Sequence, residues 1–317
     1  MKVVFMGTPG FACPPLETLA KSSHELLAVV TAPDKPSGRG QKLSACEVKM
    51  MALSLRAPVF QPDNLRDPAF LQDMAALSAD IFVVIAFRIL PEKLYSIPPY
   101  GAINIHASLL PKFRGAAPIH HALLNGESET GLTSFFLVKK VDQGDMIAQV
   151  STPIDPNENC TTLSARLSAM AGPFLLQTLD LITQPKFVPQ KQDPAQATPA
   201  PKFDSEDGLI DWRQNDRQVH NRIRAFSERP GAYSFLDGQM IKVLASLREV
   251  PAPLPPLAPG ELHVFGRRLV VGTGGAPVEI IRLQPEGKKA MDAPSFINGY
   301  RIATGQKLAS VRKEVRQ

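Results

Sequence analysis

Two polar residues near the middle of the sequence have types and spacing suited to acting on one carbonyl group. Asn104 and His106 are separated by one apolar residue in the strand-like segment GAINIH (101–106), so their side chains project from the same face. An amide and an imidazole both donate hydrogen bonds, and together they can stabilise a tetrahedral oxyanion. For an isolated Asn-x-His pair, the simpler interpretation is two polar groups satisfied by nearby backbone.

A carboxylate that could serve the same site follows 36 positions after His106. Asp142 lies in VDQGD (141–145), a turn after the next strand-like segment, together with Asp145. A carboxylate beside an imidazole fixes the orientation of the ring, and it can relay a proton directly or through water. The sequence contains no nucleophile elbow of the G-x-S-x-G type, so the pattern indicates direct group transfer without a covalent intermediate.

The elements that must hold these residues follow from hydrophobic periodicity. Apolar runs alternate with amphipathic helical segments in the first half, which is typical of a parallel sheet covered on both faces. Right-handed crossovers then predict an α/β fold with a Rossmann-like, doubly wound, mainly parallel sheet, whose functional groups gather at the carboxyl ends of the strands. We expect strands at 2–7, 25–31, 57–62, 80–87, 101–106, 133–138 and 145–154, and helices at 16–22, 47–55, 69–77 and 161–183.

The pattern changes after the last of these helices, whose expected N-cap is Thr161. Residues 184–207 are rich in Pro, Gln, Lys and Asp and have no apolar period, which predicts an interdomain linker. Beyond it, one short helix (219–226) and strand-like segments joined at DG, GT and GR turns indicate a small β-barrel of the oligonucleotide-binding (OB-like) type. The expected domains are 1–183, which carries the site, the linker 184–207, and the C-terminal β-barrel 208–317.

Bulk properties describe an ordinary soluble protein long enough for two domains. The chain has 317 residues, and single cores rarely grow far beyond about 250. No apolar run approaches the roughly 20 residues that span a bilayer, and the N-terminus MKVVFMGTPGF has the pattern of a first buried strand. Cys13, Cys46 and Cys160 are far apart and form no C-x-x-C pair, which predicts a cytoplasmic protein with neither disulfides nor a metal site.

Three motifs occur together in the centre of the chain. They are the Asn-x-His at a strand end (Asn104 and His106), the S-L-L-P loop directly after it (108–111), and the aspartate 36 positions beyond the histidine (Asp142). In this combination the sequence resembles the formyltransferase family that uses 10-formyltetrahydrofolate. Further blocks (MGTP, PDKPSGRG, HASLLPKFRGAAPI, GLIDW and LQPEGKKAM) extend the resemblance over nearly the whole chain, and they favour the members that act on initiator methionyl-tRNA.

The resemblance implies a reaction and a donor site. Asn104, His106 and Asp142 are then the catalytic residues, and 10-formyltetrahydrofolate is consumed as a co-substrate without a metal. The sequence departs from the family pattern in AFRILP (86–91), where many relatives carry a Tyr-Gly version one residue longer, and at Gly10, where an acidic residue is usual. The implied folate contacts are Ser108, Leu109, Leu110, Pro111, Phe87 and Ile85.

Basic segments bear on the acceptor. TAPDKPSGRGQKL (31–43) can approach a phosphate backbone closely, although an exposed hairpin tip is an equal alternative from the residues alone. From Phe203 onward the chain has 17 Lys and Arg and 13 Asp and Glu, so most of the net charge of +5 lies in the last third. A positive charge of this kind favours a polyanionic partner. The resemblance implies that the loop contacts the acceptor end of initiator methionyl-tRNA, with Arg39 as its main contact. The expected tRNA contacts are Lys35, Arg39, Lys42, Lys202, Lys288 and Lys289, with Arg222, Arg224, Lys242, Arg267 and Arg268 as weaker candidates.

Three other functions compete with this interpretation. An acceptor such as a glycinamide nucleotide or an amino sugar uses the same chemistry but has little need of a basic loop and a C-terminal domain. A tRNA-binding module without activity is disfavoured because the three polar residues are all present. A dehydrogenase is disfavoured because GTPGFA, after the first strand, lacks the G-x-G-x-x-G fingerprint. Nothing in the sequence indicates an obligate interface, so we expect a monomer.

Overall fold

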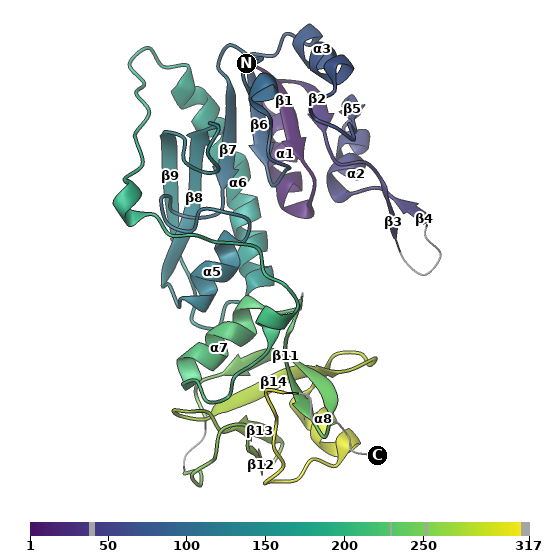
Figure 1. Cartoon of the computed structure of the whole chain (residues 1–317), viewed down its shortest axis with the longest axis vertical. Coiled ribbons are helices and arrows are strands. Elements are labelled where there is room, and N and C mark those ends of the chain that lie inside the picture. Colours follow the sequence, from purple (N-terminus) through teal and green to yellow (C-terminus); the bar gives the residue numbers. More distant parts are fainter. Residues whose placement is uncertain (38–41, 229, 251–252, 312–317) are drawn as a thin grey trace. The chain divides into compact units, whose positions relative to one another are not determined.

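The apolar runs of the first half form a seven-stranded sheet in the computed structural model (Figure 1). The strand order is β5–β2–β1–β6–β7–β8–β9, and the first five of these strands pair in parallel. The chain adds strands on one side of β1 and then, from β6 onward, on the other side, so the predicted doubly wound sheet is confirmed. The strands are β1 (Lys2–Gly7), β2 (Glu25–Val30), β5 (Val59–Phe60), β6 (Ile81–Ile85), β7 (Ala102–His106), β8 (Glu129–Phe136) and β9 (Met146–Pro153).

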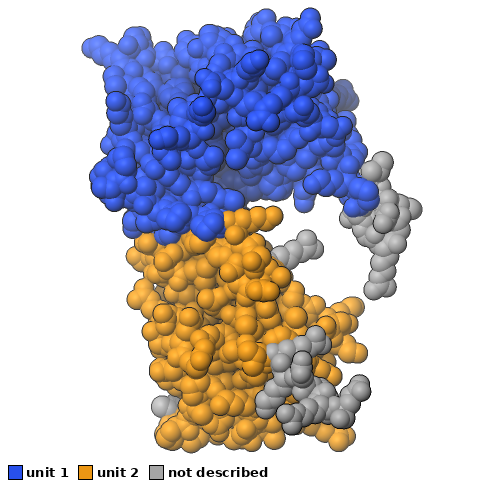
Figure 2. Space-filling model, viewed as in Figure 1, with its two compact units in different colours: residues 1–118, 129–152, 164–201 blue, residues 119–128, 153–163, 202–317 orange. Residues whose placement is uncertain are grey.

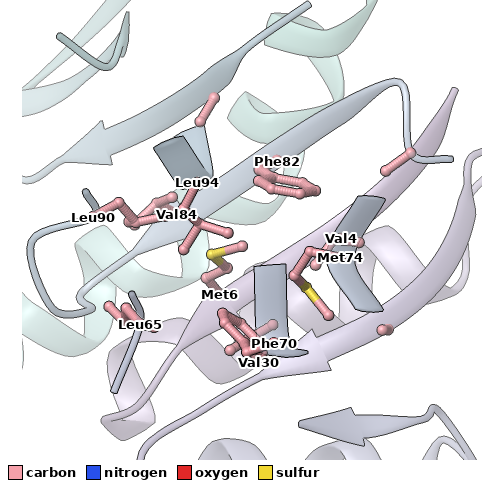
Figure 3. Close-up of a cluster of buried hydrophobic side chains, with 13 residues drawn as sticks. Val4, Met6, Val30, Leu65, Phe70, Met74, Phe82, Val84, Leu90 and Leu94 are labelled. Atoms are coloured by element: carbon pink, nitrogen blue, oxygen red, sulfur yellow. The ribbon is translucent and has the colours of Figure 1, made fainter. Parts of the chain in front are cut away.

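Both faces of this sheet are buried. Val3, Val4, Phe5 and Met6 of β1 are all fully buried, although alternate side chains of a strand point to opposite faces. On one face, the side chains of β1, β2 and β6 pack against α3 and α4 in the cluster that Figure 3 shows. The helices of this part of the chain are α1 (Cys13–Ala20), α2 (Glu47–Ser54), α3 (Pro68–Ala76), α4 (Glu92–Tyr95), α5 (Pro118–Leu124) and α6 (Cys160–Ile182).

The structure describes residues 1–37, 42–228, 230–250 and 253–311, and they divide into two units. Unit 1 contains residues 1–118, 129–152 and 164–201 (Figure 2). Unit 2 contains residues 119–128 and 153–163 together with the chain from residue 202 onward. Two segments from the first half of the sequence therefore belong to the unit that holds the C-terminal part.

The C-terminal part of unit 2 is built on an antiparallel sheet with the order β10–β11–β14–β13–β12, and β15 pairs with β14. Its core includes Trp212, whose indole Nε1 donates a 2.9 Å hydrogen bond to Oγ of Ser234. The barrel-like sheet predicted from the turn-linked strands is confirmed. The elements are α7 (Asp216–Ala225), β10 (Ala232–Leu236), β11 (Gln239–Leu247), β12 (Leu262–Phe265), β13 (Arg268–Val271), β14 (Val278–Pro285), β15 (Met291–Asp292) and α8 (Ala293–Tyr300).

Two expectations about helices need correction. The long helix α6 begins at Cys160, and Asn159 accepts a 3.0 Å hydrogen bond from the backbone N–H of Thr162, so Asn159 caps the helix and Thr161 lies inside it. The sequence interpretation also missed α8 in the barrel part. Asp292 caps that helix by accepting a 2.9 Å bond from the N–H of Ser295.

The expected linker over 184–207 is only partly separate from the units. Its first part, through Pro201, belongs to unit 1. Gln190 exchanges two backbone hydrogen bonds with Met146 of β9, at 2.7 and 2.8 Å, and the backbones of Arg114 and Ala200 are also joined, at 2.6 Å. Residues 190–200, which we call the strap, are therefore hydrogen-bonded to β9 and to the segment that follows β7. Among the described helices, none is long and apolar enough to cross a membrane.

Candidate active site

The site is built on β7, the strand between β6 and β8. Asn104 pairs in register with Val84 of β6 and Phe135 of β8, and His106 pairs with Thr133. Because Asn104 and His106 are two residues apart in a strand, their side chains leave the same face. They lie at the carboxyl end of the parallel part of the sheet, which is where doubly wound folds bind ligands.

Both ring nitrogens of His106 face protein oxygens. Nε2 lies 2.8 Å from the carbonyl oxygen of Phe113, which can only accept, so Nε2 carries a proton. Nδ1 lies 3.9 Å from Oδ2 of Asp142, which is longer than a direct hydrogen bond. His106 is 7% exposed and Asp142 is 8% exposed, so this pair is nearly sealed from bulk water. The Nδ1 position is therefore the one that remains available to a reacting group or to a bridging water.

The Asp142 turn is held in a conformation that L-residues rarely adopt. Its φ is 54°, in the left-handed region. Oδ2 accepts a 2.8 Å hydrogen bond from the backbone N–H of Gly115, which fixes the carboxylate toward His106. Gly144, two residues on, packs so closely on β8 that a Cβ atom there would lie 1.6 Å from the carbonyl oxygen of Phe136. The turn thus depends on a glycine as well as on the aspartate.

Asn104 has an unused polar group inside the protein. Its Oδ1 is buried and has no hydrogen-bond partner within the described part of the chain. Buried side-chain polar atoms are rarely left unpaired, and such an atom needs an explanation from function or ligand binding. This amide oxygen is therefore an acceptor that a ligand with its own donor could use.

The S-L-L-P loop is fixed from inside the protein. The Ser108 hydroxyl is fully buried and donates a 2.7 Å bond to the carbonyl of Lys112. Thr133 of β8 donates to the carbonyl of Ser108 at 2.7 Å and accepts from the N–H of Leu110 at 3.0 Å. Gln149 of β9 adds a 2.7 Å bond to the carbonyl of Leu110. Ser108 and Leu110 thus shape the loop from within, while Leu109 and Pro111 are partly exposed.

At the end of β6, the two expected folate contacts differ in exposure. Ile85 is fully buried, whereas Phe87 is half-buried and packs against the hydrophobic cluster of β1, β2, β6, α3 and α4. Arg88, which departs from the family pattern, donates to the carbonyls of Pro62 and Asp63 at 2.7 and 3.0 Å. Its guanidinium lies 5.2 Å from the centre of the Phe87 ring, and burial lowers its pKa. Arg88 therefore joins two loops of unit 1.

The basic residues expected to meet tRNA have different surroundings. Lys35 on β3 (Lys35–Ser37), Lys202, and Lys288 and Lys289 in the turn between β14 and β15 are exposed. Lys42 begins β4 (Lys42–Ser44), which pairs with β3, and Arg39 lies outside the residues that the structure describes. The weaker candidates are mostly occupied by contacts within the protein. Arg224 is 6% exposed, and Arg268 forms an ion pair with Glu279. Arg222 donates a hydrogen bond to the carbonyl of Asp207, and Lys242 donates one to the carbonyl of Pro230.

The sequence interpretation missed three residues that hold the candidate catalytic groups. Gln192 donates to the carbonyls of Asp142 and Gly144, Arg114 binds the Gln192 side chain, and Thr198 accepts a 2.8 Å bond from the N–H of Phe113. Gln192 and Thr198 belong to the strap, in a proline-rich stretch with no apolar period. No local pattern distinguishes them, because their partners lie about 50 to 85 positions away in the sequence.

The fold and this arrangement of groups agree with comparisons to known proteins. Residues 1–179 match the family described as Formyl transferase, and residues 202–301 match the family described as Formyl transferase, C-terminal domain. The protein is therefore a formyl transferase with both characteristic parts. Methionyl-tRNA formyltransferase of Geotalea uraniireducens (strain Rf4) is 44% identical over 307 residues, which are 96% of this chain and 97% of the relative. The corresponding protein of Geobacter sulfurreducens (strain ATCC 51573 / DSM 12127 / PCA) is 43% identical over 310 residues, 97% and 96% of the two chains. The chain belongs to the methionyl-tRNA formyltransferase family.

Solved structures share the fold at much lower identity. The crystal structure of WlaRD, a sugar 3N-formyl transferase, has a TM-score of 0.68 at 19% identity, and the match covers 91% of this chain and 99% of that one. HypX from Aquifex aeolicus, in complex with tetrahydrofolic acid, has a TM-score of 0.65 at 17% identity, over 97% of this chain and 48% of that one. At these identities the likeness concerns the fold alone.

Proposed function

We propose that the protein transfers a formyl group from 10-formyltetrahydrofolate to the amino group of methionine on initiator tRNA. The observation that carries the proposal is that Asn104 and His106 share one face of β7 and that Asp142 lies 3.9 Å from His106. The relatives that match along nearly the whole chain bear the name methionyl-tRNA formyltransferase. Structural neighbours crystallised with 5-N-formyl-THF or tetrahydrofolic acid support a folate as the donor.

The reaction is direct attack of the amine on the formyl carbon. The new C–N bond forms as the carbonyl oxygen becomes an oxyanion, and the bond to N10 of the folate then breaks. The Asn104 side chain donates to that oxygen through Nδ2–H, and His106 supplies a second donor through Nδ1–H. Both donors leave one face of β7, so they reach a single oxygen.

One proton must move from the attacking amine to N10. Asp142 accepts it, directly or through a water beside the His106–Asp142 pair, and the leaving nitrogen receives one in return. The amine therefore loses one proton and N10 gains one, so the reaction is balanced without a covalent enzyme intermediate. Asp142 also stabilises His106 while the imidazole carries both protons.

The donor is assigned to the surface beside the end of β7. We propose that the pterin and its linker lie along the S-L-L-P loop and the end of β6, against Leu109, Pro111 and the half-buried Phe87. Ser108, Leu110 and Ile85 are buried, so their part in folate binding is to shape this surface. A Ser108→Ala variant would then raise KM for the folate through the loop that it supports.

The acceptor tRNA is assigned to basic residues of both parts of the chain. We propose that residues 1–183 carry catalysis, that 184–207 connect the parts, and that 208–317 bind tRNA. Arg39→Ala should raise KM for tRNA and reduce the salt dependence of tRNA binding, because a protein that neutralises fewer phosphates releases fewer counterions. Unchanged tRNA kinetics would mean that the loop is only a hairpin tip. The proposed tRNA contacts are Lys35, Arg39, Lys42, Lys202, Lys288 and Lys289.

A competition assay tests the acceptor. The enzyme is given 10-formyltetrahydrofolate with methionyl initiator tRNA, uncharged initiator tRNA and glycinamide ribonucleotide in one mixture. We expect formyl-methionyl-tRNA as the product, and no product from uncharged tRNA, which lacks the amine. Formylation of the small acceptor alone would keep the catalytic chemistry and overturn the tRNA assignment.

We further propose that the protein acts as a monomer in the cytoplasm. Size-exclusion chromatography with light scattering tests the oligomeric state.

A further inference from the structure

Gln192 of the strap has a side chain whose every hydrogen-bonding position is used. Its Nε2 donates to the carbonyl of Asp142 at 2.9 Å and to the carbonyl of Gly144 at 2.8 Å. Its Oε1 accepts from Nε and Nη2 of Arg114, at 3.0 and 2.7 Å. Gln192 is 8% exposed, so these bonds form away from bulk water. The amide can take only one orientation, because the two carbonyls need a donor and the guanidinium needs an acceptor.

These bonds close the turn that carries Asp142. The turn contains a left-handed residue, which is unfavourable unless neighbouring groups over-determine it. Gln192 ties the carbonyls of Asp142 and Gly144 to one nitrogen atom. The carboxylate of Asp142 is fixed separately, by the N–H of Gly115, the residue next to Arg114. Both the backbone and the side chain of Asp142 are therefore held by neighbouring groups. Arg114 and the strap keep those groups in place.

The strap also fixes the other side of His106. The side chain of Thr198 accepts a hydrogen bond from the N–H of Phe113. The carbonyl of Phe113 in turn accepts a 2.8 Å hydrogen bond from Nε2 of His106. The backbone of Arg114 binds the strap twice, through the carbonyl of Thr198 at 2.9 Å and the N–H of Ala200 at 2.6 Å. One segment thus sets the groups that face both ring nitrogens of the histidine.

From this geometry we infer that Gln192, oriented by Arg114, is a positioning residue for formyl transfer. It acts through Asp142, by keeping the carboxylate at its distance from Nδ1 of His106. The inference rests on the proposed function, because it assigns a role within that reaction. The polar atoms of Gln192 are all bonded to protein groups, so its loss should change the rate of transfer and leave substrate binding intact.

The test is a double-mutant cycle between Gln192→Met and Asp142→Asn. Methionine has a similar length but offers no donor to the two carbonyls. Gln192→Met alone should lower kcat about tenfold or more, with KM for both substrates within about twofold. In the Asp142→Asn background the same change should cost less than about twofold, because residues that act as one unit are not additive. Gln196→Ala is the matched control, since this glutamine lies in the same strap and its side chain binds the exposed Asp193.

Two results would overturn the inference. One is a Gln192→Met variant with the kcat of the wild type, and the other is a Gln192→Met substitution that lowers kcat as much in the Asp142→Asn background as in the wild type. If Gln192→Met does not fold, Gln192→Glu replaces it, since the carboxylate keeps the Arg114 pair and loses both donors.

A second readout, the NMR shifts of His106, does not depend on the acceptor. The ¹⁵N shifts of the His106 ring should change in the Gln192 variant and stay unchanged in Gln196→Ala. A wild-type enzyme that formylates no tRNA refutes the proposed function, whereas unchanged His106 shifts refute the positioning role.

Discussion

Nδ1 of His106 lies 3.9 Å from Oδ2 of Asp142, and that same oxygen accepts a 2.8 Å hydrogen bond from the backbone of Gly115. The carboxylate is therefore oriented by the backbone and not by the imidazole. The ring is oriented in turn by Phe113, on its opposite nitrogen. Two separately oriented groups therefore lie side by side without a direct hydrogen bond, and on the proposed mechanism they exchange a proton with the reacting amine.

The first prediction concerns the carboxylate. Asp142→Asn keeps the shape of the side chain but removes its charge, so it can neither accept the proton nor stabilise a protonated His106. We expect kcat to fall by about a hundredfold or more. Asp145→Asn is the control, because Asp145 belongs to the same turn but has no contact with His106 among the described interactions. Steady-state kinetics with methionyl-tRNA measure both variants, and equal losses in the two would remove the special role of Asp142.

The second prediction separates activity from stability at Asn104. The side chain contributes no hydrogen bond through its buried Oδ1, so Asn104→Ala should leave the free energy of unfolding within about 1 kcal/mol of wild type. Its kcat should fall by about a hundredfold, because an oxyanion donor is removed. Thr133→Ala offers the contrast, since Thr133 is fully buried and bonded to Ser108, Leu110 and Gln149. Urea titration should show a loss of roughly 1–3 kcal/mol for that variant, and a similar loss for Asn104→Ala would contradict the assignment.

The third prediction concerns the glycine of the catalytic turn. A methyl group at Gly144 would collide with the carbonyl of Phe136, so Gly144→Ala must push the turn away from β8. We expect the free energy of unfolding to fall by about 2 kcal/mol or more, with loss of activity. Gly299→Ala in α8 meets no atom within 4 Å and should raise stability by about 0.5–1 kcal/mol. A Gly144→Ala enzyme of full stability and full activity would show that the turn is not set by this close approach.

The fourth prediction concerns pH. Burial lowers the pKa of His220, whose Nδ1 lies 2.9 Å from the Ser246 hydroxyl and whose Nε2 donates to the carbonyl of Pro156. Its unfolded pKa is about 6.5, so the unfolded chain binds a proton more readily than the folded chain. The stability due to neutral His220 is complete above this pH and is lost as the pH falls toward the lower folded pKa. Melting temperatures of wild type should therefore drop more steeply between about pH 7 and pH 5 than those of His220→Gln. Parallel curves would refute this role.

Most of the fold and the chemical core of the site could be predicted from the sequence. The strands of the first sheet are continuous apolar runs, and such runs are informative because both faces of the sheet are buried. Asn104 and His106 could be paired because strand periodicity fixes their common face. Asp142 was found by its spacing from His106, as the resemblance implied, although only the structure gives the distance between them.

The remaining features depend on contacts that no local pattern encodes. Helix α8 is only eight residues long, and it begins directly after Asp292, which is both the last residue of β15 and the cap of the helix. The N-cap of α6 is Asn159, two positions earlier than expected, because its side chain reaches the N–H of Thr162. The strap has the composition of a linker. Its Gln192 and Thr198 bind backbone groups that are distant in the sequence, so no local pattern marks these two residues.

The central claim is that Asn104, His106 and Asp142 transfer a formyl group directly to methionyl-tRNA. The most direct test is a single-turnover measurement with enzyme in excess over methionyl initiator tRNA and saturating 10-formyltetrahydrofolate, for wild type and His106→Ala. The account predicts formyl-methionyl-tRNA from the wild-type enzyme and a rate constant lower by about a hundredfold or more in the variant, with an unchanged melting temperature. A wild-type rate in His106→Ala, or no formylation of this tRNA by the wild-type enzyme, would contradict it.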